Sequence, residues 1–148
     1  MADSIYEVIA ARYAGSAALR AAIPGGLVPG RARTDADAGG VRGAFTLLSN
    51  APSWTTEDDF YHESGRVQFS VFAPTAGEAE AAARALCSLD PDGFDRLADV
   101  DLDGGGTVVH AVRASGPAGP TLDESEGPGG ARVWMSTVDY LFHVSRSL

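Results

Sequence analysis

Residues 66–87 read RVQFSVFAPTAGEAEAAARALC, and the change of pattern within this stretch decides the fold. In its first part, apolar and polar residues alternate, which places Val67, Phe69 and Val71 on one face of a β-strand. From Thr75 onwards the sequence has a capping-box pattern, followed by apolar residues at helical spacing. A half-buried strand that leads directly into an amphipathic helix predicts an α+β domain.

Similar patterns predict the other elements of the domain. A capping-box pattern at Ser4 begins a helix, which Gly15 interrupts, Ser16 recaps and Pro24 ends. Strand-like composition recurs in four further segments, of which the second can also be a long hairpin tip: 44–49, 54–63, 107–112 and 132–144. Because strands joined by hairpins favour antiparallel pairing, we predict an antiparallel sheet of about four to five strands with two helices packed on one face.

Turn-forming residues separate these elements. The sequence predicts a turn at residues 50–52 and mobile loops near 34–40 and 115–130, because these stretches are rich in glycine, proline and small polar or acidic residues. The length of 148 residues is usual for one domain, so we expect a single domain over residues 1–148.

The charge balance excludes one class of partner. The chain has 20 acidic residues against 11 basic ones, a formal net charge of −9, and all its basic residues are arginine. Nucleic-acid binding depends on neutralising phosphates, so we reject it as the main activity. No apolar run approaches the ~20 residues that span a bilayer. The first residues do not read as a signal peptide, and we therefore expect no membrane partner and a place in the cytoplasm.

The acidic stretch that begins at Asp99 resembles the first half of a calcium-binding loop. Asp99, Asp101 and Asp103 alternate before Gly104, as in an EF-hand. The twelfth position of that loop should be a glutamate, and here it is His110. We therefore interpret the stretch as a solvated acidic turn.

Histidine and cysteine are the other candidates for chemistry. His62 is flanked by Asp58, Asp59 and Glu63, so it could serve as a metal ligand or a general base. A lone histidine in an acidic loop is more often a surface residue, however, and the other two histidines lie in predicted strands. Cys87 falls on the apolar stripe of a predicted helix, where a buried, inert thiol is expected. We predict no catalytic, cofactor-binding or metal-binding residue and no cofactor.

Three stretches resemble the tail terminator and tail-completion proteins of long-tailed bacteriophages. They are residues 19–32, LRAAIPGGLVPGRA, residues 66–80, RVQFSVFAPTAGEAE, and the closing strand 132–140, RVWMSTVDY. Together they span nearly the whole chain in the order found in that family.

The resemblance implies a structural protein of the virion tail or neck, assembled in the host cytoplasm. Such a protein forms a homo-oligomeric ring, usually a hexamer, that caps the tail tube and joins it to the head-completion (neck) protein, while DNA only passes through the lumen. A ring needs one patch docking onto a different patch of the next copy. Because aromatic residues are enriched at interface cores, Trp54, Phe60 and Tyr61 are the candidate interface residues.

Three alternatives remain open at this stage. A neck or minor capsid protein of similar fold would show the same resemblance. A small metal-dependent hydrolase would use His62 with its neighbouring carboxylates. A monomeric module would bind another protein through its long loops.

Overall fold

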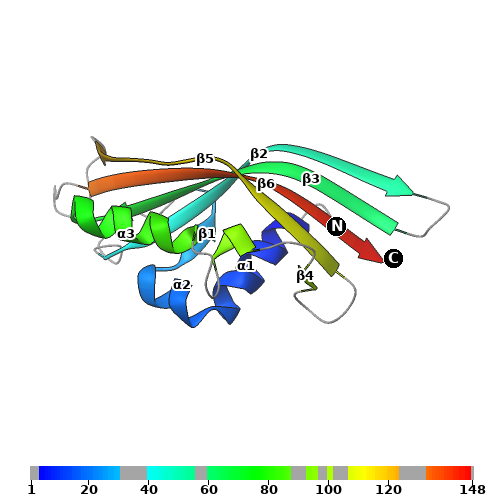
Figure 1. The fold of residues 1–148 in the computed structure, drawn as a ribbon, viewed down its shortest axis with the longest axis horizontal. Coiled ribbons are helices and arrows are strands. Elements are labelled where there is room, and N and C mark those ends of the chain that lie inside the picture. Colours follow the sequence, from blue (N-terminus) through cyan, green and yellow to red (C-terminus); the bar gives the residue numbers. More distant parts are fainter. Residues whose placement is uncertain are drawn as a thin grey trace.

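The computed structural model shows a long, twisted β-sheet with helices packed along one of its sides (Figure 1). The structure describes residues 4–30, 40–55, 60–87, 93–96, 100–101, 107–123 and 133–147. Its elements are α1 (Ser4–Gly15), α2 (Ala17–Ala22), β1 (Leu27–Pro29), β2 (Arg42–Thr55), β3 (Phe60–Ala73), α3 (Ala76–Leu86), the 3-10 helix η2 (Phe94–Arg96), β4 (Val100–Asp101), β5 (Thr107–Asp123) and β6 (Val133–Ser147). The predicted α+β class is confirmed.

The sheet has the strand order β1-β2-β3-β6-β5-β4. The four long strands, β2, β3, β6 and β5, are antiparallel to one another, and the short strands β1 and β4 lie at the two ends. β1 pairs with β2 in parallel, so the sheet is mixed, whereas we predicted an antiparallel one. Parallel pairing of consecutive strands requires a crossover of about a dozen residues. The connection over residues 30–41 has that length.

The segments predicted between residues 44 and 72 form two long strands instead of three. β2 continues through the predicted turn at 50–52, and β3 begins at Phe60, so the described residues 54–55 and 60–63 belong to the two strands of a long hairpin. Pro52 does not interrupt β2, because β1 pairs only with residues 43–45 and leaves Pro52 on an edge of the described sheet. An edge strand tolerates a residue without an N–H group.

The predicted loop at 115–130 is partly wrong, because residues 115–123 continue β5. The pairing with β6 shifts register at three places, between residues 113 and 115, 115 and 118, and 118 and 121. The second and third shifts contain Gly116 and Gly119, and both glycines have a φ of 93°. Each shift inserts an extra residue into β5, as a β-bulge does. Glycine tolerates this backbone conformation, so the strand passes two Gly–Pro pairs without ending. Residues 124–130 and 34–39, which we predicted as loop, lie outside the described residues.

Two of the three α-helix starts follow the predicted caps. The Ser16 hydroxyl accepts a hydrogen bond from the Leu19 N–H at 3.1 Å, and it divides the expected N-terminal helix into α1 and α2. The Thr75 hydroxyl accepts a hydrogen bond from the Glu78 N–H at 3.2 Å and begins α3. Such caps each stabilise a helix by about 1 kcal/mol. The described part of the chain therefore has three α-helices where the sequence predicted two.

The hydrophobic core lies between the helices and the sheet, with Phe69 of β3 near its centre. The ring of Phe69 lies 4.8 Å from that of Phe94 and 5.8 Å from that of Tyr140, measured between centroids. Buried side chains of the three helices and the four long strands surround it: Ile5, Ile9, Leu19, Ile23, Ala82, Leu86, Phe45, Val109 and Phe142. One face of the sheet thus carries the core.

Candidate docking face

The other face of the sheet, which we call the open face, is turned away from the helices (Figure 1). Side chains alternate along a strand, and residues paired directly across two strands share a face. The strand register therefore assigns these described residues to the open face: Ser49 of β2, His62, Ser64, Arg66 and Gln68 of β3, Asp139, Leu141, His143 and Ser145 of β6, and His110 and Val112 of β5.

All three histidines of the chain meet on this face. His143 is paired with His110 on one side and with Ser64 on the other. The rings of His62 and His143 are nearly parallel, with centroids 6.0 Å apart. Nδ1 of His143 lies 2.7 Å from the Ser64 hydroxyl, and Nδ1 of His62 lies 2.9 Å from the Ser145 hydroxyl. The hydroxyls hold both rings over neighbouring strands.

The three histidines do not form a metal site. His62 and His110 lie on strands that β6 separates, so their backbones are about 10 Å apart across the sheet. His62 is also offset along its strand by two residues from the row of His110. Among the residues that the structure describes, no three His, Cys, Asp or Glu side chains are arranged to hold a metal ion.

Of the carboxylates expected to act with His62, the one that the structure describes, Glu63, does not lie beside it. Glu63 is fully buried and paired with Val144, so it lies on the core face, opposite to His62. Asp58 and Asp59 lie outside the described residues. The described part of the chain therefore does not bring His62 together with the neighbouring carboxylate that a hydrolytic site would use.

A shallow hollow of about 370 Å³ lies on the open face, beside the histidines. It is lined by Ser64, Gly65, His110, Val112, Leu141, Phe142 and His143. Val112 and Leu141 are directly paired, and each is 50% exposed. Exposed apolar side chains that are grouped with neutral polar groups are typical of a binding surface.

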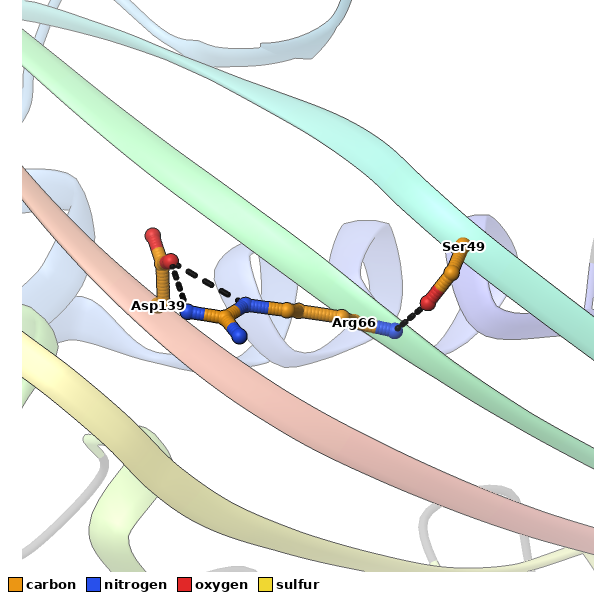
Figure 2. Close-up of polar contacts among 3 residues, drawn as sticks. All are labelled: Ser49, Arg66 and Asp139. Atoms are coloured by element: carbon orange, nitrogen blue, oxygen red, sulfur yellow. Dashed lines mark hydrogen bonds and ion pairs between the residues drawn. The ribbon is translucent and has the colours of Figure 1, made fainter.

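An ion pair lies flat on the open face, next to the hollow (Figure 2). The Arg66 guanidinium reaches from β3 to β6, where its Nη2 and Nε donate to Asp139 Oδ2 at 2.7 and 3.2 Å. On the other side, the Arg66 backbone N–H donates to the Ser49 hydroxyl at 3.3 Å. Asp139 is the one acidic residue among those that define the open face, and Arg66 neutralises it. Among the residues named above for the open face, the charges of Arg66 and Asp139 therefore cancel.

The two edges of the sheet are poorly suited to pairing with another chain. Pro52 lies in the part of β2 beyond β1, and Pro117 and Pro120 lie in the part of β5 beyond β4. Proline removes a backbone donor, and bulges bend the strand, so both features protect an edge against strand addition. The open face is therefore a better candidate for association than either edge.

The predicted interface residues lie at the far end of the β2–β3 hairpin. The backbone of Trp54 pairs with Tyr61, and that of Thr55 pairs with Phe60. Their side chains lie outside the described part, so their role in an interface stays a prediction. The sequence analysis missed Val112 and Leu141, because their exposure depends on the face to which the register assigns them.

A second group of polar side chains lies at the edge of the core, around Tyr140. The Tyr140 hydroxyl donates to Asp95 of η2, and Arg113 Nη2 lies 3.2 Å from Asp95 Oδ2. Burial raises the pKa of both Tyr140 and Cys87. A thiol with a raised pKa stays protonated and is a poor nucleophile. Cys87 is therefore a buried structural residue, as predicted.

Comparison with known proteins adds no relative. A scan of the chain against protein-family models gives no match, and a search of curated proteins gives none either. In the part of the chain that the structure describes, no helix is long and apolar enough to cross a membrane. The chemistry of the open face therefore carries the functional argument.

Proposed function

We propose that this chain is a structural assembly protein whose copies dock through the open face into a homo-oligomeric ring. The observation that carries the proposal is the apolar hollow, which lies beside the Arg66–Asp139 ion pair on a molecule with a net charge of −9. Two acidic copies repel each other unless the surfaces that meet are free of unpaired acidic groups. The described residues around the hollow meet this condition, because Arg66 pairs with Asp139.

The distribution of exposed apolar side chains supports docking of unlike patches. Val28 and Leu48 are exposed on β1 and β2, at one end of the strand order. Val112, Leu122 and Leu141 are exposed on β5 and β6, toward the other end. A patch at one end that meets a different patch of the next copy gives a head-to-tail contact, and such contacts form a ring when the rotation between copies closes.

The resemblance to tail terminators gives this ring a role. We propose that it caps the tail tube of a long-tailed phage and binds the head-completion protein, with DNA passing through the lumen. A neck or minor capsid protein would use the same docking face. The open face and its hollow support an assembly protein more than a hydrolase. A hydrolase would use His62 with a neighbouring carboxylate, and Glu63 lies on the opposite face of the sheet from His62.

The mass of the full chain in solution tests the proposal. At pH 8, sedimentation velocity and light scattering should show an oligomer built from the 15.3 kDa chain, with about six copies in the ring. Leu141→Glu should raise the dissociation constant at least about tenfold, because it places an unpaired charge in the contact.

Ala81→Glu is the matched control, because it adds the same charge at an exposed position of α3. It should leave the oligomer mass unchanged. A wild-type chain that is monomeric at every concentration would contradict the proposal and favour a monomeric binding module. Equal dissociation by the two variants would remove the open face from the interface.

A further inference from the structure

We infer that the bulged part of β5, residues 114–121, opens locally from β6, and that Arg113 holds it closed by bridging it to η2. We call residues 114–121 the arch. The inference goes beyond the proposed function and does not depend on it, because it concerns how one strand is held within a single copy. Three observations carry it: the sparse pairing of the arch, its exposure, and the contacts of Arg113.

The arch pairs with β6 at fewer positions than the preceding part of β5. Every residue from 107 to 113 has a partner on β6, whereas the paired residues of the arch are Ser115, Ala118 and Thr121. Regular pairing returns at residues 122 and 123, so the arch is joined to the sheet at both ends. Fewer paired residues leave fewer ladder hydrogen bonds to break, which lowers the free energy of local opening.

Burial adds little to the stability of the arch. Residues 114–119 are all exposed, and Thr121 is exposed as well. In the described sheet, β4 pairs with residues 108 and 109 of β5, so the arch also lies along an outer edge. Segments with few buried apolar contacts open at the lowest free energies. We therefore expect the arch to open while the core strands stay paired.

Arg113 lies directly before the arch and contacts two elements. Its Nη1 donates to the Gly116 carbonyl oxygen at 3.4 Å, within the arch. Its Nη2 lies 3.2 Å from Oδ2 of Asp95, on the 3-10 helix η2. The guanidinium therefore bridges the arch to η2.

η2 is itself held by the core. Phe94 is fully buried among core aromatic rings, and the next residue, Asp95, accepts a hydrogen bond from the Tyr140 hydroxyl. Arg12 of α1 donates to the Gly93 carbonyl oxygen at 3.0 Å. The bridge thus connects a weakly held part of the sheet edge to a well-packed part of the fold.

Opening of the arch would change the margin of the open face. Ser115 is paired with Asp139, and Ala118 is paired with Thr137, so the strand register places the arch beside the open-face side of β6. The arch is therefore a movable border of that face, and Arg113 determines how often it opens.

Hydrogen–deuterium exchange of the full chain, followed by mass spectrometry, tests the inference. It is measured at a concentration at which sedimentation shows the dissociated chain, so that docking does not protect the arch. In the wild type, the amides of the arch should exchange at least about tenfold faster than those of residues 67–71 at the centre of β3.

Arg113→Gln should speed exchange of the arch about two- to fivefold, because the Arg113–Asp95 pair is partly exposed and such pairs contribute modestly. Exchange of residues 67–71 should not change. Arg84→Gln is the matched control, because it removes an exposed ion pair on α3, and it should leave the arch unchanged. Circular dichroism checks that each variant is folded.

Asp95→Asn removes the same ion pair from its other side and should speed exchange of the arch to a similar extent. The double variant with Arg113→Gln should exchange no faster than Arg113→Gln alone, because both changes remove one shared interaction. Additive effects in the double variant would show that the two residues act separately, and the bridge would be refuted.

Two further outcomes overturn the inference. In the wild type, an arch that exchanges as slowly as residues 67–71 does not open locally. Arg113→Gln might instead match Arg84→Gln in the arch, or speed exchange of the arch and of β3 alike. Arg113 would then have no specific role in holding the arch. Each of these results leaves the proposed function intact, because the mass of the oligomer is measured separately.

Discussion

The two faces of the sheet differ sharply, although they are built from the same strands and from alternating residues. On the core face, Phe69, Tyr140 and Phe142 are almost fully buried against the helices. On the open face, the neighbouring Leu141 is half exposed and lies beside histidines, serines and an ion pair. We therefore expect substitutions on the core face to change mainly the stability of the fold, and substitutions on the open face to change mainly association.

Replacement of Phe69 by alanine should have the largest effect on stability. Its ring is fully buried and lies within 6.2 Å, centroid to centroid, of the rings of Phe45, Phe94, Tyr140 and Phe142. Phe69→Ala would leave a cavity among these rings, so we expect the free energy of unfolding to fall by about 3–5 kcal/mol. Urea denaturation of the dissociated chain measures this change.

Leu141→Ala is the counterpart on the open face. Because half of that side chain is already in water, the free energy of unfolding of the dissociated chain should fall by about 1 kcal/mol or less. Equal losses for the two variants would show that the faces are not divided between stability and association.

The sequence predicted those parts of the fold where a local pattern matches the final environment. The alternation from Val67 to Val71 and the capping residue Thr75 predicted β3 and α3, because each pattern depends on neighbours in sequence. The continuation of β5 past residue 115 was missed. Glycine and proline usually end a strand. Here Gly116 and Gly119, both at positive φ, allow bulges that keep β5 in the sheet.

The open face could be predicted only in part. The alternation along β6 predicted a half-buried strand, but it could not assign His143 and His110 to one pair. That assignment depends on the register between strands, and residues 124–132 intervene between β5 and β6. From the sequence, the histidines could therefore be interpreted only one by one. Their meeting on one face is a property of the sheet and not of any local motif.

Tyr140→Phe sharpens the comparison, because it removes a polar contact on the core side. The variant loses the hydrogen bond from the Tyr140 hydroxyl to Asp95 but keeps the ring packing, so the free energy of unfolding should fall by about 1–3 kcal/mol at neutral pH. Asp95 keeps its contact with Arg113, which limits the loss.

Tyr140 should also make the free energy of unfolding depend on pH in the alkaline range. Burial, and then the bond to Asp95, raise the pKa of Tyr140 in the folded chain above that of the unfolded chain, about 10. The unfolded chain therefore loses this proton first, and the stability that it supports is present below pH 10 and declines above it. Urea denaturation between about pH 8 and 11 should show a shallower decline for Tyr140→Phe than for the wild type. Parallel declines would contradict the prediction.

Arg66→Gln removes the polar contact on the open face and should have a small effect on stability. The Arg66 side chain is 45% exposed and that of Asp139 is 12% exposed, so water and salt screen the pair. We expect the free energy of unfolding of the dissociated chain to fall by about 1 kcal/mol or less, and salt should reduce the difference between variant and wild type. Arg84→Gln is the control, because the Arg84–Glu80 pair on α3 is more exposed, and it should lower the free energy of unfolding by about 0.3–0.5 kcal/mol.

The two variants should differ in their effect on association. Arg66→Gln leaves Asp139 without its cation on the open face, so the oligomer should become weaker. Arg84→Gln should leave the oligomer unchanged. If Arg66→Gln instead destabilised the dissociated chain as strongly as Tyr140→Phe, the open face would be contributing to the fold itself, and the division between the two faces would fail.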